Sequence, residues 1–274
     1  MKTLYISDLD GTLLDKNAEL SAFTLETLNR LSAARVSFSV ASARTPNTAS
    51  IILENLKITV PIILLNGAVI YDLQGKKYLN TEIIDDFTVK QIINIIHEYS
   101  AGAFMYGLTD GVLDTFYETL DPLPLRRFHD DRVSKFGKKF TFISNFLRES
   151  SDVIYFTLLD TIERLSPIYA KFSEIHRISS VMTRDNYSDD LFYLECFSSK
   201  ATKYNAAKWL KKELDFDRIV GFGDNINDLP LFEACDEAYA VENAQDEVKR
   251  AASCVIDANT ADGVARWLMD NVEL

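Results

Sequence analysis

The chain has 274 residues, of which 47% are apolar and 26% are charged, as is ordinary for a folded globular protein of one or two domains. Its formal net charge of −12 argues against nucleic acid or an anionic membrane surface as the main partner. A small anionic substrate stays possible, because a few local cations can dominate a binding pocket.

Cysteine usage and the N-terminus bear on the cellular compartment. The three cysteines have no CxxC spacing, and the three histidines are scattered, which argues against a zinc site and favours a reducing compartment. The opening "MKTLYISD" lacks the pattern of a signal peptide, and no apolar run approaches the length of a membrane span. We therefore expect a cytoplasmic protein.

Both ends of the chain alternate short apolar runs with amphipathic helical stretches. We expect strands at 3–7, 36–42 and 61–65, with helices at 19–35 and 46–56. Near the C-terminus we expect strands at 218–223, 238–241 and 254–257, with helices at 202–214, 229–234, 244–252 and 261–272. This alternation predicts a parallel sheet with helices on both faces, which binds ligands at the carboxyl ends of its strands.

The middle of the chain has a different pattern. We expect helices at 88–99 and 161–175, the second broken or restarted at Pro167, and strands at 103–107, 112–116, 153–159 and 178–183. This pattern indicates an α+β domain at 83–191, inserted into an α/β core made of 1–82 and 192–274.

A basic cluster stands out in this middle segment, within "LPLRRFHDDR" at 123–132, which we expect to be a loop. It holds Arg126, Arg127, Arg132 and His129. These residues either recognise a substrate or form a solvated surface that Asp130 and Asp131 neutralise, and we favour the second interpretation.

Polar side chains follow the predicted strands of the core. Asp8 and Asp10 lie two positions apart after the first strand, so they share a face and repel each other unless a cation lies beside them. The other polar residues at such ends are Ser42, Arg44, Lys200, Lys203, Asp224 and Asp228. Acidic pairs from two strand ends make a site for a hard cation, and Mg²⁺ suits such oxygen ligands.

Three motifs resemble those of one family. "DLDGTLL" near the N-terminus and "GDNIND" near the C-terminus resemble the first and fourth motifs of the haloacid dehalogenase superfamily of phosphohydrolases, and "LNGAVI" at 65–70 resembles its Cof-type branch. The resemblance covers essentially the whole chain. It implies a Rossmann-like core with an α+β cap domain inserted between the second and third motifs, where 83–191 falls.

The resemblance also implies roles for individual residues. Asp8 would be the nucleophile that forms an aspartyl-phosphate, and Asp10 would be the general acid and base. Ser42, Lys203 and Asn227 would contact the phosphoryl group, and Arg44 and Asn66 would contact the substrate. For Arg44 the alternative is an ion pair with a carboxylate of the inserted domain, and we favour the substrate contact.

A magnesium ion follows from the same resemblance. Asp8, Asp224 and the backbone carbonyl of Asp10 would bind Mg²⁺, while Asp228 would hold water molecules on the metal. Taken alone, "DLDGT" could be a turn and "GDNIND" a turn with a capped helix, and the capping role and the metal role of Asp228 are compatible.

Two departures from the family pattern matter. The second motif reads Ser42-Ala43-Arg44, where the family usually has Gly in the middle. The third-motif lysine is usually followed by Gly, but Lys203 is followed by Tyr204, so Lys200 is an alternative. We prefer Lys203, because Ala206 and Leu210 then stand at the family's offsets with helical spacing.

The implied activity is that of a Mg²⁺-dependent phosphatase acting on small phosphorylated metabolites, such as sugar phosphates or phosphorylated cofactors. The first alternative is a sugar phosphomutase of the same superfamily, and the second is a regulator that binds a ligand without catalysis. Dehalogenase chemistry is disfavoured, because it needs no general acid at the position of Asp10. A dinucleotide-binding domain would have GxGxxG after the first strand, and "DGTLLD" stands there instead.

Overall fold

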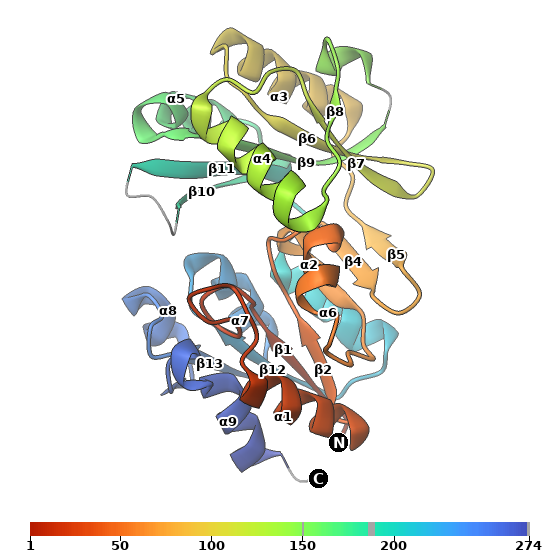
Figure 1. The fold of residues 1–274 in the computed structure, drawn as a ribbon, viewed down its shortest axis with the longest axis vertical. Coiled ribbons are helices and arrows are strands. Elements are labelled where there is room, and N and C mark those ends of the chain that lie inside the picture. The colour runs from red at the N-terminus through yellow and green to blue at the C-terminus, as the bar shows by residue number, and fades with distance from the viewer. Residues whose placement is uncertain (150, 186–189, 273–274) are drawn as a thin grey trace. The chain divides into compact units, whose positions relative to one another are not determined.

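The chain divides into two compact units. The computed structural model describes residues 1–149, 151–185 and 190–272 (Figure 1). The first unit combines Met1–Asn80 with Thr202–Leu274, and the second is Thr81–Ala201. The second unit extends beyond the expected 191, because the strand that follows pairs within its sheet.

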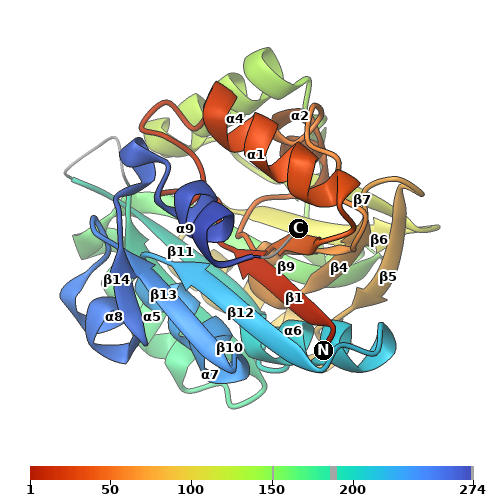
Figure 2. The same cartoon turned by 90° about the horizontal axis from the view of Figure 1, so that it is seen from below.

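The first unit contains a parallel five-stranded sheet in the order β14-β13-β12-β1-β2. Its strands are β1 (Thr3–Ser7), β2 (Ser37–Val40), β12 (Arg218–Gly223), β13 (Glu237–Val241) and β14 (Cys254–Ile256). The N-terminal β1 lies between β2 and β12, so strands from both ends of the sequence meet in the middle of the sheet (Figure 2). The predicted parallel α/β architecture is confirmed.

Helices cover both faces of this sheet. They are α1 (Ala22–Ala33), α2 (Pro46–Ile52), α6 (Lys203–Glu213), α7 (Leu229–Ala234), α8 (Asp246–Ala251) and α9 (Gly263–Asn271). Leu4 and Ile6 of β1 belong to the apolar cluster formed with α6 and α7, whereas Tyr5 contacts Trp267 of α9. This alternation follows from the two-residue period of a strand, and it buries β1 on both sides.

A small three-stranded sheet extends the first unit beyond β2. It is made of β3 (Ile62–Leu64), β4 (Val69–Asp72) and β5 (Lys77–Thr81), and a parallel bridge between Ala41 and Ile63 links it to the end of β2. A tight turn at Leu65–Gly67 joins β3 to β4. The sequence pattern indicated β3 but not β4 or β5.

The second unit contains a six-stranded sheet in the order β10-β11-β9-β6-β7-β8. Its strands are β6 (Phe104–Thr109), β7 (Val112–Tyr117), β8 (Thr141–Phe142), β9 (Asp152–Thr161), β10 (Ile178–Arg184) and β11 (Leu191–Ser198). All neighbours pair antiparallel except β7 and β8. The pattern predicted this mixed α+β composition, although it missed β8 and β11.

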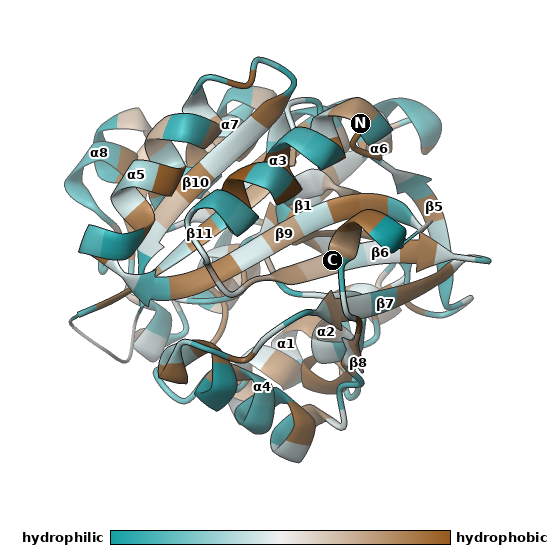
Figure 3. Ribbon diagram, turned by 90° about the horizontal axis from the view of Figure 1, so that it is seen from above, coloured by the Kyte–Doolittle hydropathy of each residue, from teal (hydrophilic) through white to brown (hydrophobic). Residues whose placement is uncertain are grey.

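The two faces of this sheet carry different side chains. Helices α3 (Asp86–Glu98) and α5 (Ile162–Ser173) cover one face with their apolar stripes (Figure 3). Met105 and Phe156 point to this core, which mixes aliphatic side chains with phenylalanines, whereas their neighbours Phe104 and Tyr155 belong to an aromatic set on the other face. The expected break at Pro167 is wrong, because α5 runs through this residue.

The expected loop at 123–132 is also wrong. These residues begin α4 (Leu123–Phe136), with Pro124 in the first turn and Gly137 ending the helix in a left-handed conformation. Only Leu125 is fully buried along this helix, so the sequence shows no apolar stripe of helical spacing.

Acidic neighbours surround the basic cluster of α4. Asp131 pairs with Arg132 at 3.2 Å and with Lys135 at 2.7 Å, and His129 contacts Asp130 at 2.9 Å. These pairs place a carboxylate beside Arg132 and beside His129, as the favoured interpretation expects for this part of the cluster.

Candidate active site

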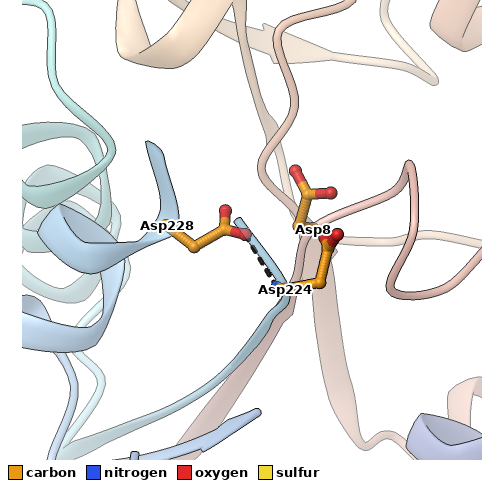
Figure 4. A group of neighbouring side chains, drawn as sticks. All are labelled: Asp8, Asp224 and Asp228. Carbon is orange, nitrogen blue, oxygen red and sulfur yellow. Dashed lines mark hydrogen bonds between the residues drawn. The ribbon is translucent and has the colours of Figure 1, made fainter. Parts of the chain in front are cut away.

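Three carboxylates gather at the carboxyl end of the parallel sheet. Asp8 follows β1, and its backbone N–H donates to the carbonyl of Phe222 in β12 at 2.9 Å. Asp224 follows β12, and Asp228 lies four residues later at the start of α7 (Figure 4). Each of the three offers a carboxylate oxygen, and these oxygens lie within 4.8 Å of one another. Parallel pairing of β1 with β12 therefore brings together aspartates that are more than 200 positions apart in the sequence.

Lys203 supplies the cation of this cluster. It is the first residue of α6, its side chain is 1% exposed, and its Nζ donates to Asp8 Oδ1 and to Asp228 Oδ1, each at 2.6 Å. Burial alone would lower the pKa of Lys203, but the carboxylates of Asp228 and Asp8 outweigh it and raise that pKa above its ordinary value. Lys200, the alternative from the sequence, is exposed and belongs to the second unit.

Asp228 is fully buried, and both of its oxygens accept hydrogen bonds. Oδ1 accepts from Lys203, while Oδ2 accepts from the backbone N–H groups of Asp224 and Asn225 at 2.9 and 3.0 Å. Asp228 thus closes the turn that carries Asp224, as the third residue of a capping box whose N-cap is Asn225. The N-cap role expected from the sequence differs, because the Asp228 side chain makes no capping hydrogen bond to α7.

Two residues that the sequence analysis passed over fix the carboxylate of Asp224. Thr12 is buried, and its hydroxyl donates to Asp224 Oδ1 at 2.7 Å. Gly11 has a φ of +81°, and a Cβ at this position would lie 2.4 Å from Asp224 Oδ2. The signal was the complete "DGT" turn, whose glycine and hydroxyl residue follow the aspartate pair directly.

The cluster carries more negative charge than Lys203 neutralises. Burial raises the pKa of Asp8 well above its usual range; Lys203 opposes this rise, while the neighbouring aspartates add to it. Burial, together with the charge of Asp228, raises the pKa of Asp224 to about 7. Crowded carboxylates of this kind favour either a proton or a metal cation.

The donor set of this cluster fits a hard cation. Among the residues that the structure describes, Asp8 Oδ2 and Asp224 Oδ2 accept no hydrogen bond, so both stay available as ligands. The oxygens of Asp228 are already in use. Asp8 and Asp224 are therefore the side chains suited to binding a metal ion directly.

Arg44 forms an ion pair with Asp10. Its Nε donates to Asp10 Oδ2 at 2.7 Å and its second terminal nitrogen donates to Oδ1 at 2.6 Å, which is a two-pronged ion pair. Ser42 is buried nearby at the end of β2, and its Oγ accepts from the backbone N–H of Arg44 at 3.2 Å. The structure thus places Arg44 against the second aspartate of "DLD", a contact that the sequence did not predict.

The turn after β3 supports both Asn227 and the start of α6. Asn66 has a left-handed φ of 55°, and its Oδ1 accepts from Asn227 Nδ2 at 3.2 Å. Gly67 packs so closely that a Cβ would lie 2.3 Å from the carbonyl oxygen of Thr202, the residue before Lys203. The "LNGAVI" segment therefore sets the position of the lysine as well as that of Asn66.

The fold and this site define a class of protein, namely an α/β protein with a buried acidic site at the carboxyl end of its parallel sheet. The family model of haloacid dehalogenase-like hydrolases matches residues 5–268. The chain belongs to this family of hydrolases, and the predicted family and fold class are confirmed.

Individual relatives cover nearly the whole chain. One is the 5-amino-6-(5-phospho-D-ribitylamino)uracil phosphatase YitU of Bacillus subtilis, which is 27% identical over 97% of this chain and 96% of its own length. Another is the pyridoxal phosphate phosphatase YbhA of Escherichia coli, which is 23% identical over 97% of each chain. A haloacid dehalogenase-like hydrolase from Bacteroides thetaiotaomicron has the same fold, with a TM-score of 0.83 at 20% identity over 99% of this chain and 100% of that one.

The helices give no sign of a membrane span. Within 1–149, 151–185 and 190–272, none combines the length and the low charge that crossing a bilayer requires.

Proposed function

We propose that this protein is a Mg²⁺-dependent phosphatase of small phosphorylated metabolites, acting through an aspartyl-phosphate on Asp8. The observation that carries the proposal is the buried contact of Lys203 with Asp8 Oδ1, which leaves Asp8 Oδ2 open beside Asp224. The relatives named as phosphatases of a ribityl compound and of pyridoxal phosphate support this substrate class.

The first half of the reaction forms the covalent intermediate. A carboxylate oxygen of Asp8 attacks phosphorus, the bond from phosphorus to the ester oxygen breaks, and Asp10 gives a proton to the departing alcohol. Both oxygens of Asp10 are held by Arg44, so this ion pair has to open for Asp10 to carry that proton.

The second half releases phosphate. A water molecule attacks phosphorus, Asp10 takes the proton of that water, and the bond between phosphorus and Asp8 breaks. Lys203 remains beside Asp8 and stabilises the negative charge that builds up on the transferring group.

A magnesium ion would be held by Asp8, Asp224 and the backbone carbonyl of Asp10, with Asp228 stabilising the arrangement. When bound, it supplies positive charge that lets an anionic carboxylate approach an anionic phosphate.

The remaining predicted residues have supporting roles in this proposal. Ser42 and Asn227 bind phosphoryl oxygens together with Lys203, and Arg44 and Asn66 contact the rest of the substrate. The inserted segment at 83–191 acts as a cap domain that selects the substrate and excludes water. The protein would work in the cytoplasm on small phosphorylated molecules.

The test measures release of inorganic phosphate from a panel of sugar phosphates and phosphorylated cofactors. Wild type is compared with Asp8→Asn, each with Mg²⁺ and with excess chelator. We expect release that needs both Mg²⁺ and Asp8, with the substituted enzyme at least ~10³-fold slower. Transfer of the phosphoryl group back to the substrate, without release, would favour the mutase alternative. Binding without turnover of any compound would favour the regulator.

A further inference from the structure

A second buried lysine lies outside the site described above, wholly within the second unit. Lys138 follows the end of α4, and 7% of its surface is exposed. Its Nζ lies 4.6 Å from the centre of the Tyr106 ring and 4.8 Å from that of Phe140. The ammonium group is therefore held between two aromatic faces on the side of the sheet that carries the aromatic set.

No carboxylate neutralises this lysine. Over the described parts of the chain, the side chain of Lys138 has neither an ion pair nor a hydrogen bond, and its ammonium group has cation–π contacts with the two rings. Aromatic faces attract a cation, but they accept none of its three N–H donors in the way that an oxygen does. A buried cation in this state is costly, so the arrangement points to an acceptor that the protein itself does not supply.

The charged surroundings favour an anion as that acceptor. Arg132 of α4 is the charged residue that acts on Lys138, and it adds positive potential. Arg132 itself pairs with Asp131 at 3.2 Å and stacks over the Phe128 ring at 4.8 Å. Burial, with a smaller contribution from Arg132, lowers the pKa of Lys138 to about 7, so the lysine gains a full charge most readily when an anion is present.

Other titratable groups on this face act on its tyrosines. Glu195 of β11 and Arg132 both act on Tyr106, whose hydroxyl also bonds to Thr157. The same two charged residues act on Tyr193, together with Asp185. Burial of Lys138 and the charge of Arg132 account for the lowered pKa without any contribution from these carboxylates.

The ammonium group is reachable from solvent. In the described ranges, the Ser151 hydroxyl is the one fully enclosed side-chain polar atom without a partner. Since the Lys138 ammonium also lacks a protein acceptor, it must keep a small opening.

We propose that Lys138, held between Tyr106 and Phe140 and reinforced by Arg132, forms a binding site for an oxyanion in the second unit. The ligand class comprises carboxylates and phosphate or sulfate groups, whose oxygens accept the free N–H donors of the ammonium. This site goes beyond the proposed phosphatase activity and does not depend on it.

The test is calorimetric titration of the whole protein with sulfate and, separately, with malonate, both in excess chelator. The chelator leaves the acidic cluster without a metal, so binding there does not mimic the proposed site. We expect saturable binding of at least one probe at pH 6, weakened at least about tenfold in Lys138→Met. Lys139→Met is the matched control, because Lys139 is the exposed neighbour and its loss leaves the affinity unchanged.

Proton uptake on binding separates this role from a purely structural one. At pH 8 the free lysine is mostly neutral, so sulfate binding takes up close to one proton, whereas at pH 6 it takes up almost none. Titrations in two buffers of different ionisation enthalpy measure this number. Lys138→Arg keeps the charge and should bind sulfate without the pH-8 uptake.

Two outcomes would overturn the proposal. The first is the absence of saturable binding of either anion to wild type at pH 6. The second is binding that Lys138→Met leaves unchanged, which would place the anion elsewhere. Preference for sulfate over malonate, or the reverse, identifies which kind of oxyanion the site takes.

Discussion

The two units each bury a lysine, and the two lysines have opposite surroundings. Lys203 in the first unit donates to two carboxylates at 2.6 Å, and its pKa is raised. Lys138 in the second unit lies between two rings without a carboxylate, and its pKa is lowered to about 7. Both side chains are buried to a similar degree, so the available partners decide the charge state rather than burial itself.

The contrast also separates two kinds of site. Lys203 donates to two carboxylates of the protein, and in the proposed mechanism it would stabilise the charge that develops on Asp8 and on the phosphoryl group. Lys138 has no such partner, which suits it to recognising a ligand that brings its own negative charge. In the two proposals, the same residue type therefore serves catalysis in one unit and ligand binding in the other.

Removing Lys203 is the change with the largest expected effect. Lys203→Met should lower kcat by roughly 10³-fold, because Asp8 and Asp228 lose the cation between them. It should also destabilise the first unit, since two buried carboxylates become unpaired. Steady-state kinetics and urea unfolding measure the two effects.

Lys200→Met is the control for this prediction, because Lys200 is exposed. We expect its kcat to stay near that of wild type. A large loss in Lys200→Met with a small one in Lys203→Met would assign the third-motif role to the other lysine.

A smaller effect is expected at the hydroxyl that fixes Asp224. Thr12→Val removes the 2.7 Å hydrogen bond to Asp224 Oδ1 while keeping the volume of the side chain. We expect the Mg²⁺ concentration that gives half-maximal activity to rise by about 10- to 100-fold, because an oriented ligand binds a metal more tightly. Thr12→Ser keeps the hydroxyl and should restore the wild-type requirement. Equal metal requirements in all three proteins would mean that Thr12 does not orient a metal ligand.

The smallest expected effect is on the pH dependence of the free energy of unfolding, which should differ between the two lysines. The ordinary pKa of lysine is 10.5, and in the folded protein that of Lys138 is about 7, so between these values the unfolded chain binds more protons than the folded one. The free energy of unfolding of wild type should therefore rise with pH in this window, relative to Lys138→Met, by roughly 1 kcal/mol per pH unit. Lys203 contributes no slope there, because its raised pKa keeps it charged in both states until the pH nears 10.5.

Urea unfolding of the two proteins between pH 7 and pH 9.5 tests this prediction, in a buffer without oxyanions. Lys139→Met should run parallel to wild type. If the free energy of unfolding of Lys138→Met also had the same pH dependence as that of wild type, the pKa of Lys138 would not be lowered in the folded protein.

Local sequence patterns predicted much of the fold. The alternation of strands and helices indicated the parallel core, and a strand of period two explains why Leu4 and Tyr5 face opposite sides. The patterns failed to predict some elements that bury half or fewer of their side chains. Helix α4 was expected to be a loop because a single residue along it, Leu125, is fully buried, and β11 was missed.

By itself, the sequence determined which chemical groups this protein brings to the end of its sheet. The aspartates, the lysine candidates and the "LNGAVI" turn are local motifs at strand or helix ends. The shared strand face expected for Asp8 and Asp10 does not apply, because β1 ends at Ser7. These motifs depend on neighbouring residues, so they can be recognised without the fold.

Only the tertiary structure decided which of those groups meet. Lys203 and Asp8 are 195 positions apart, Thr12 and Asp224 are 212 apart, and the Arg44 pair with Asp10 spans 34. The absence of a carboxylate at Lys138, within the described part of the chain, is equally a property of packing. The physical reason is that the charge and availability of a buried group depend on its neighbours in space, and parallel strand pairing chooses those neighbours from distant parts of the sequence.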